Sequence, residues 1–552
     1  MHPRKPCLSA ILAAGLTLAA IPAWTGSDLG RLEFPTSAQP EAQTHFLRGV
    51  AALHSFWYDE AADEFRAAQK AEPGFALAYW GEAMTYNHPI WGEEDLAAVR
   101  SALERLAPTA AERAAKAPAE REKAWLGAVE ALYAEGEKPA RARAYSAAMR
   151  RIFERWPEDV EAGSFYALSL IGPTLASDGG TFGEPRERVL MRAAAVLEEL
   201  FERNPQHPGV VHYMIHAYDD PTHAPLGLRA ARVYAQLAPA AHHALHMPSH
   251  IFVQLGRWSD VAASNEASWA ASVAWTERRK LPVDKQDFHS LSWLSYAYLQ
   301  QGRVAKARET LEIARKAAEK SPSPRIVAAL DSMEARLWID TRAWSEAKLP
   351  ALPSAPEGAQ AGAQGAHCQS MAMDSADHKS TLFAAGLAAA WRGDSATADA
   401  AVARLKALPK GGRSYGSDSA EVMEKEISGV ALLTKDRKDE GLALLAEAAK
   451  AEEATNAPSG PPELKPALEL YGEALLEQGK AAEAADWFRR ALLRTPNRPA
   501  SLLGAARAAA RLGHEAEARK LYSELAEIWK QADSGLADVA EARSYLAATP
   551  AR

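Results

Sequence analysis

The chain has 552 residues, a formal net charge of −8, 48% hydrophobic residues and charges of both signs spread along its length. This acidic, mixed composition argues against nucleic acid as the main partner, because nucleic-acid-binding surfaces are strongly basic. The length exceeds what one compact hydrophobic core supports, so several domains or an array of repeats is expected.

The first element along the chain is a candidate export signal at residues 1–23. A short basic start precedes an apolar run at residues 8–21, and small residues follow it. A run of this length is typical of a secretion signal and is too short to span a bilayer. We therefore expect a secreted or periplasmic protein with no transmembrane segment after signal removal. Since Cys7 would leave with the signal, Cys368 would be a lone thiol, and no disulfide would form within the chain.

Small and aromatic residues recur along the rest of the chain with a period of 34 residues. The period is clearest near the C-terminal end, where two successive sets are Gly479, Ala484 and Phe488, then Gly513, Ala518 and Tyr522. Near the N-terminal end the same scheme is carried by Gly49, Ala61, Phe65, Ala68 and Pro73. These spacings are those of tetratricopeptide repeats (TPRs), in which small residues let paired helices approach and aromatic residues fill the groove between them. The sequence predicts an all-α fold, a right-handed α-solenoid of TPR helix-turn-helix units.

Two interruptions divide the predicted array. Residues 350–377 are rich in Pro, Ala, Gly, Gln and Ser, a composition that predicts a loose linker or loop. A shorter break follows at residues 456–466. We therefore expect an N-terminal TPR array at 27–349 and a C-terminal TPR array at 378–552. The sequence has no recognisable phosphate-binding loop, dinucleotide fingerprint or nucleophile elbow.

Histidines in the middle of the N-terminal array keep the period of the repeat. His212 and His216 are four residues apart, and His246 with His250 repeats this pair 34 residues later. Four-residue spacing puts each pair on one face of a helix. The shared register predicts that four imidazoles point into the concave groove from adjacent helices. Paired imidazoles one helical turn apart are a common way to hold copper, iron or zinc.

The same register places further polar side chains near these four histidines. His243 precedes His246 by one turn, two neighbouring carboxylates follow His216, and His289 takes the position of His243 in the next unit. Either Asp219 or Asp220 is suited to complete a metal site or to orient an imidazole. The insertion at residues 278–287 is positioned to fold over the groove. The predicted ligands are His212, His216, His246, His250, His243, Asp220 and His289.

A separate pair, His54 and His88, is also one period apart. Pro89 directly follows His88 and favours a capping or turn role over metal binding for this pair.

Three classes of function are compatible with these patterns. The first is a protein that binds a transition metal through its histidines, with a metal-dependent oxidoreductase or hydrolase acting on a small molecule as the enzymatic version. The second is a TPR scaffold that holds a protein or peptide partner in the groove without metal, and the third is a carrier or sensor of a small molecule. A groove built from His, Tyr and Met, rather than from Lys, Arg and Asn, favours the first class. Purely structural histidines are the remaining interpretation.

Several phrases of the sequence resemble a family of exported bacterial TPR proteins. They are LHSFWYDEA, AYWGEAMTYNHPIWG, HPGVVHYMIHAYDDP, LHMPSHIFVQLGRWSD and PNRPASLLGAARAAARLG, which occur in this order along most of the chain. The resemblance implies a helical repeat fold and export, with HYxIHA and HMPSHI as the family's signature. It implies no particular reaction.

Overall fold

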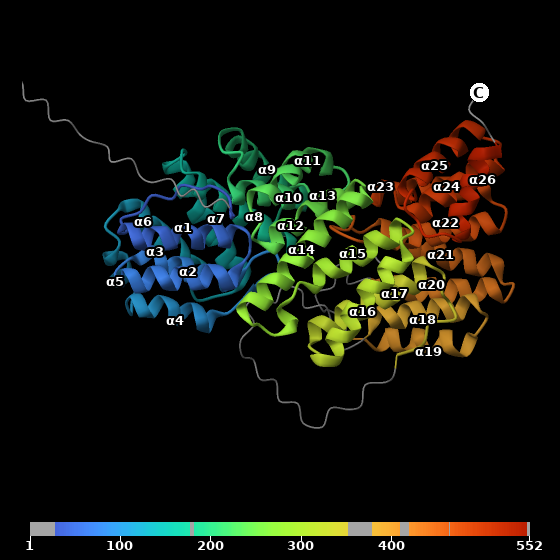
Figure 1. The fold of residues 1–552 in the computed structure, drawn as a ribbon, viewed down its shortest axis with the longest axis horizontal. Coiled ribbons are helices and arrows are strands. Elements are labelled where there is room, and N and C mark those ends of the chain that lie inside the picture. The colour runs from blue at the N-terminus through green and yellow to red at the C-terminus, as the bar shows by residue number, and fades with distance from the viewer. Residues whose placement is uncertain (1–27, 177–181, 351–377, 409–418, 463, 549–552) are drawn as a thin grey trace, which may run out of the picture.

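The structure, a computed structural model, describes residues 28–176, 182–350, 378–408, 419–462 and 464–548. Throughout these residues α-helices follow one another, joined by short connections, and give the molecule the elongated shape seen in Figure 1. The all-α TPR solenoid expected from the sequence is confirmed. The predicted export signal and nearly all of the predicted linker lie outside the described residues, so those two predictions remain untested.

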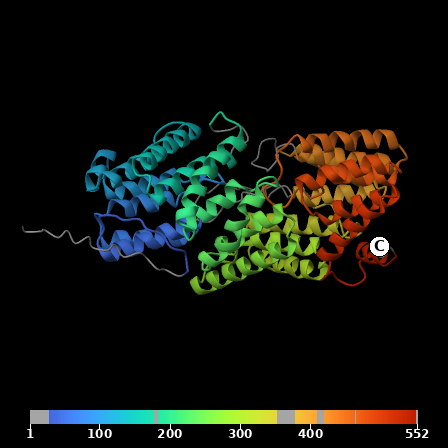
Figure 2. The same ribbon diagram turned by 90° about the horizontal axis from the view of Figure 1, so that it is seen from above.

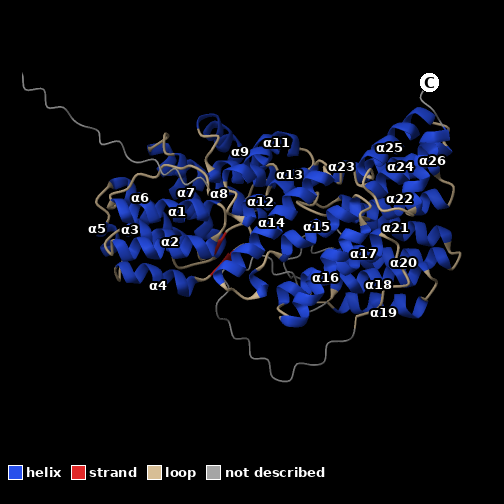
Figure 3. Ribbon diagram, viewed as in Figure 1, coloured by secondary structure: helices blue, strands red, loops and turns tan. Residues whose placement is uncertain are grey.

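The N-terminal third of the molecule consists of paired helices and one short strand pair. The strands β1 (Asn87–His88) and β2 (Glu93–Glu94) are antiparallel and are coloured red in Figure 3. The helices are α1 (Pro40–His54), α2 (Tyr58–Ala71), α3 (Ala76–Met84), α4 (Leu96–Leu106), α5 (Ala110–Lys116), α6 (Glu120–Leu132), α7 (Lys138–Arg155), α8 (Val160–Leu175) and α9 (Arg186–Arg203).

The middle of the chain contains the units that carry the histidine pairs. Its helices are α10 (Pro208–Ala217), α11 (Ala224–Leu237), α12 (His242–His246), α13 (Pro248–Gln254), α14 (Trp258–Arg279), the short 3-10 helix η1 (Val283–Lys285), α15 (Phe288–Gln300), α16 (Val304–Lys320) and α17 (Pro324–Asp340).

The C-terminal part continues the alternation of paired helices. It consists of α18 (Lys379–Trp391), α19 (Ser395–Ala407), α20 (Ser419–Thr434), α21 (Lys438–Glu453), α22 (Ala467–Glu477), α23 (Ala481–Arg494), α24 (Pro499–Arg511), α25 (Glu515–Ile528) and α26 (Ala537–Ala548). None of the described helices is both long and apolar enough to cross a membrane.

The glycines and aromatic residues that reveal the repeat in the sequence also explain how its helices pack. The ring of Phe65 on α2 lies so close to α1 and α3 that a methyl group at Gly49 would come within 2.8 Å of it, and one at Gly81 within 2.2 Å. Phe488 on α23 occupies the same position between Gly472 and Gly504, where the corresponding distances are 3.0 and 2.2 Å. Only glycine leaves room for the ring, so the spacing of glycine and phenylalanine determines how closely the helices approach.

The solenoid folds back on itself at two places, whereas each repeat of an open solenoid contacts only its neighbours. Helix α1 packs on α10, so the first repeat meets the unit that begins the histidine region. Near the other end, the indole nitrogen of Trp258 donates to the carbonyl of Asn497 at 2.9 Å, and that of Trp529 donates to the carbonyl of Gln300 at 3.1 Å. Figure 2 shows the resulting position of the red C-terminal helices beside the yellow-green middle ones.

A buried ion-pair network holds the second of these closures together. Arg498 is 1% exposed and donates to Glu469, Asp340 and the hydroxyl of Tyr296, which lie on α22, α17 and α15. The ammonium group of Lys465 pairs with the same Glu469 at 2.8 Å. Burial alone would raise the pKa of Glu469, but the two cations lower it to about 2. The Arg498 guanidinium therefore joins the C-terminal repeats to α15 and α17, and the Glu469 carboxylate that it shares with Lys465 stays ionised.

Candidate metal centre

Two groups of three histidines lie side by side in the middle of the chain. In the first group, the Nε2 atom of His212 lies 3.1 Å from Nε2 of His216 and 3.3 Å from Nε2 of His243. The ligand atoms of all three residues lie within 4.8 Å of one another. His212 and His216 come from α10 and His243 from α12, so two first helices of consecutive repeats build this group. We call it the first cluster.

The second cluster has the same construction one repeat further along. Nε2 of His246 lies 3.1 Å from Nε2 of His250 and 3.1 Å from Nε2 of His289. These residues belong to α12, α13 and α15, and their ligand atoms also meet within 4.8 Å. The six predicted histidines therefore do meet, but they form two groups of three. The sequence predicts a single group of four histidines with the other two nearby.

A one-residue break interrupts the helix that carries His243, His246 and His250, but the boundary between the clusters falls before it, within α12. The sequence predicts a single first helix through His246 and His250, but Pro248 separates α12 from α13 because its nitrogen carries no hydrogen to continue the helix. His243 and His246, both on α12, join different clusters. Their ring centroids are 6.1 Å apart, and those of His216 and His250 are 6.0 Å apart. The two clusters are thus in direct contact.

Hydrogen bonds to the other ring nitrogen orient three of the imidazoles. Nδ1 of His212 donates to the carbonyl oxygen of His54 at 2.6 Å, and Nδ1 of His250 donates to Oδ2 of Asp219 at 2.7 Å. Nδ1 of His246 bonds to Oδ1 of Asn265 at 2.7 Å, and that amide uses its NH2 group on a helix carbonyl. Because these acceptors need the proton on Nδ1, each neutral ring presents an unprotonated Nε2 to its cluster.

Burial keeps most of these rings neutral. Loss of water lowers the pKa of His212 to about 3 and that of His289 to about 4. The pKa values of His216, His243 and His246 are well below normal for the same reason, with neighbouring histidines adding to the effect. Neutral imidazole is the form that binds transition metals, so these five rings are already in the required protonation state without a metal.

An aromatic side chain borders each cluster. The ring of Phe56 lies 4.4 Å from that of His212 and 5.5 Å from that of His243, measured between centroids. Trp293 borders the second cluster, at 4.5 Å from His250 and 5.2 Å from His289. The sequence predicts only packing roles for such aromatics.

The clusters are buried on one side and partly accessible on the other. His212 and His246 are fully buried, whereas the side chain of His250 is 12% exposed. His243 and His289 are also of intermediate exposure. A small ligand can therefore reach the clusters from the side of these three histidines.

The two predicted carboxylates have different surroundings. Asp219 receives a second hydrogen bond, from Gln254 Nε2 to Oδ1 at 3.1 Å, and so orients the second cluster without being one of its three members. Asp220 lies outside both clusters. Its Oδ1 accepts from the backbone of Thr222 and His223, and its Oδ2 bonds to the ring of His223 at 2.7 Å. Both oxygens of Asp220 are therefore already bonded within the turn that precedes α11.

The predicted insertion at 278–287 lies against the first repeat. Arg279 pairs with Glu60 and Asp63 on α2, and Lys285 approaches Asp59 on the same helix. The insertion thus ties the histidine region to the first repeat.

A third buried group, His54, Glu161 and His207, supports the first cluster through the backbone of His54. The carboxylate of Glu161 binds Nε2 of His54 at 2.6 Å and Nε2 of His207 at 2.8 Å, while Nδ1 of His54 meets the hydroxyl of Tyr213 at 2.9 Å. Burial would raise the pKa of Glu161, but His207 and His54 hold it far below its usual range. Because these groups satisfy one another, the trio fixes the backbone of His54, whose carbonyl orients His212. The sequence singles out His54 by its period and gives no signal for the other two.

A distant segment contacts two residues that adjoin the second cluster. Gln254 donates to the carbonyl of Pro458 at 2.7 Å, and Gly460 lies so close to Trp293 that a methyl group there would be 2.7 Å from its ring. The sequence indicates only a break between repeats at residues 456–466. In the structure this break passes over the aromatic wall of the histidine site.

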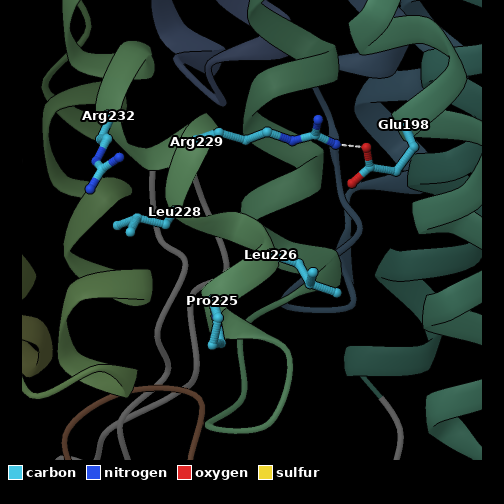
Figure 4. A pocket seen from close by; sticks show the side chains of 6 residues that line it. All are labelled: Glu198, Pro225, Leu226, Leu228, Arg229 and Arg232. Atoms are coloured by element: carbon cyan, nitrogen blue, oxygen red, sulfur yellow. Dashed lines mark ion pairs between the residues drawn. The ribbon is translucent and has the colours of Figure 1, made fainter.

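A surface hollow on α9 and α11 is shown in Figure 4. Its lining includes an ion pair between Arg229 and Glu198, next to Leu226, which is 54% exposed. The histidines do not line it, and the carboxylate there is already paired with a guanidinium group. This hollow is therefore separate from the two clusters.

Comparison with known proteins adds only general structural similarity. No protein-family model and no curated protein matches this sequence. Among solved structures, the chain is similar to the human IFIT1 dimer with m7Gppp-AAAA, at 14% identity and a TM-score of 0.33, covering 93% of this chain and 90% of that one. It is also similar to yeast Tom70, at 13% identity and a TM-score of 0.27 over 92% and 95% of the two chains. The P58(IPK) TPR domain has 12% identity and a TM-score of 0.20 over 93% and 99%. No argument about function rests on these similarities.

Proposed function

We propose that this protein binds transition metal ions through its two three-histidine clusters. One observation carries the proposal: Nε2 of His246 and Nε2 of His250 face each other at 3.1 Å, while both Nδ1 atoms donate to acceptors. Two neutral imidazoles in this state direct lone pairs at each other, which is repulsive unless a cation lies between them. A third imidazole, that of His289, brings its Nε2 to 3.1 Å from Nε2 of His246.

The distances within each cluster match the size of a metal ion. Imidazole nitrogens bind zinc at about 2.0 Å, and tetrahedral ligand angles then separate neighbouring nitrogens by about 3.3 Å. The four close nitrogen pairs are 3.1 to 3.3 Å apart. A second proton on His250, beside Asp219, would let its Nε2–H donate to Nε2 of His246 and relieve that close pair. The lone pair of His246 would then be occupied, and His289 would still be directed at it. A bound ion accounts for all three nitrogens.

The scaffold alternative finds less support at this site. A groove that grips a peptide needs Lys, Arg or Asn side chains to bind carboxylates and backbone groups. The clusters instead present neutral imidazoles walled by Phe56 and Trp293. A secreted or periplasmic location, expected from residues 1–23, belongs to the same proposal and is tested by cell fractionation.

The test is elemental analysis of untagged protein beside a His246→Ala/His250→Ala variant. The matched control is His223→Ala/His514→Ala, which removes two histidines outside both clusters. Copper, iron or zinc in the parent and the control, with a clear reduction in the cluster variant, supports the proposal. Binding to the folded form should also raise Tm on reconstitution. A parent that contains no metal and whose Tm is unchanged by each of the three ions refutes it.

A further inference from the structure

The two clusters lie close enough to act as one centre. His243 and His246 share the short helix α12, and His216 packs against His250 across the boundary at 6.0 Å. Two-metal sites hold their ions about 3.5–4 Å apart so that one small ligand can touch both. Resting on the metal binding proposed above, we infer that the six histidines form a single dinuclear copper centre that binds dioxygen between its two ions.

The donor set favours copper. All six cluster members are imidazoles, and the carboxylates beside them are engaged elsewhere: Asp219 with the ring of His250 and with Gln254, and Asp287 with His242 and Ser290. Paired iron sites in helical proteins are instead built from Glu side chains together with His, and magnesium or manganese prefers oxygen ligands. Copper ranks highest in affinity for nitrogen donors.

The low charge of copper(I) suits the burial of the site. His212 and His246 are fully buried, and the cost of placing an ion in such surroundings rises with its charge. The six imidazole ligands are neutral, and the negative charges of Asp219 and Asp287 lie beside the second cluster without being among its ligands, so two divalent ions would be only partly offset. Two copper(I) ions bring half that charge, so the reduced form of the centre costs least.

The open side of the centre suits a small, weakly polar ligand. Three nitrogens per ion leave a further coordination position free, as in catalytic metal sites. The partly exposed His243, His250 and His289 mark the side from which a ligand enters, and Phe56 and Trp293 make the surroundings apolar. Dioxygen combines small size with low polarity.

The binding step balances without any further reactant. Each copper(I) gives one electron to dioxygen, so the two ions become copper(II) and the O=O double bond becomes the O–O single bond of bound peroxide. No proton moves and no O–O bond breaks. Return of both electrons releases dioxygen, so the step is reversible.

The test loads metal-free protein with copper(I) in the absence of air and then admits oxygen. The variants are His243→Gln for the first cluster and His289→Gln for the second, both at partly exposed positions that tolerate substitution better than the buried histidines. His514→Gln, at a surface position, is the control. Circular dichroism and Tm verify that each variant is folded.

The parent and the control should bind two copper ions, develop a charge-transfer absorption with oxygen and lose it under vacuum. Their oxidised centres should give no electron paramagnetic resonance signal, because two coupled copper(II) ions cancel each other's spin. Each cluster variant should bind one copper and, after chemical oxidation, show the signal of an isolated copper(II).

Three results overturn the inference. Two copper(II) ions with full, uncoupled signals show separate sites, and one copper per parent chain shows that the clusters do not act together. Binding of zinc or iron with no affinity for copper(I) excludes the copper chemistry. In all three cases metal binding itself survives, whereas a protein that takes up no metal ion refutes the proposed function as well.

Discussion

Two adjacent carboxylates provide a sharp test of how the second cluster is oriented. Asp219 bonds Nδ1 of His250 at 2.7 Å, whereas Asp220 bonds only groups of its own turn. In Asp219→Asn, the amide has one oxygen for two donors, His250 and Gln254, so its NH2 group must face one of them. The proton on Nδ1 loses its charged acceptor, and His250 is no longer held with Nε2 towards the other histidines of its cluster.

The size of the effect follows from the bond that is lost. A hydrogen bond to a charged group contributes about 1.5–3 kcal/mol, and solvent screens this one little because the Asp219 side chain is 6% exposed. Changing the partner of a ligating histidine typically weakens metal binding about 10–100-fold. We expect this loss at one of the two ions, with the first cluster unaffected.

The assay is competition against a chelator of known affinity, with parent, Asp219→Asn and Asp220→Asn proteins at one pH. Asp220→Asn should lower Tm modestly, because it weakens the turn before α11, and should leave both metal affinities unchanged. Equal losses in the two variants, or no loss in Asp219→Asn, would refute the assigned role of Asp219.

Three further predictions concern the closure of the solenoid and the segment over the site. Because the pKa of Glu469 is depressed, its contribution to the free energy of unfolding is complete above the unfolded pKa of about 4.5 and is lost as pH falls towards 2. This contribution amounts to about 3 kcal/mol. Urea unfolding should therefore show a shallower acid dependence in Glu469→Gln than in the parent. Gly256→Ala places a methyl group 2.3 Å from the carbonyl oxygen of Pro496 and should lower the free energy of unfolding by about 2–4 kcal/mol. Gly479 has a similar positive φ but open space around it, so Gly479→Ala should cost about 1 kcal/mol. Thermal melts compare the two variants, and equal costs would contradict the contact at Gly256. Gly460→Ala should displace the indole that borders the second cluster and weaken metal binding there with little change in Tm, and an unchanged chelator competition would show that this contact is irrelevant to the site.

Periodicity predicts much of this molecule because repeats are determined by local spacing. Gly49 and Phe65 are recognisable in the sequence by the same spacing that makes them pack in the structure. The register of His212 with His246 likewise predicts that they lie in neighbouring units. What it misses is the division into two clusters, which separates His243 from His246 on one short helix, and the break at Pro248 within a helix predicted to be continuous.

Other parts of the site depend on tertiary contacts that have no local signature. The choice between Asp219 and Asp220 depends on which carboxylate the turn occupies. Trp293 has the same sequence pattern as any packing aromatic of a repeat. Gln254 and Pro458 meet across a separation of 204 residues, a contact that no pattern within either segment predicts.

The return of the C-terminal repeats onto the middle of the chain changes how this solenoid should unfold. In an open array, stability is a sum of units and neighbouring interfaces, so the ends fray while the middle stays folded. Here the bond between Trp258 and Asn497 joins residues 239 positions apart. Closing so long a loop costs entropy before any contact compensates it, which favours late formation of this junction during folding. Once formed, it couples the repeats carrying the histidines to the far end of the chain, so a chemical denaturant should melt them in one transition rather than repeat by repeat.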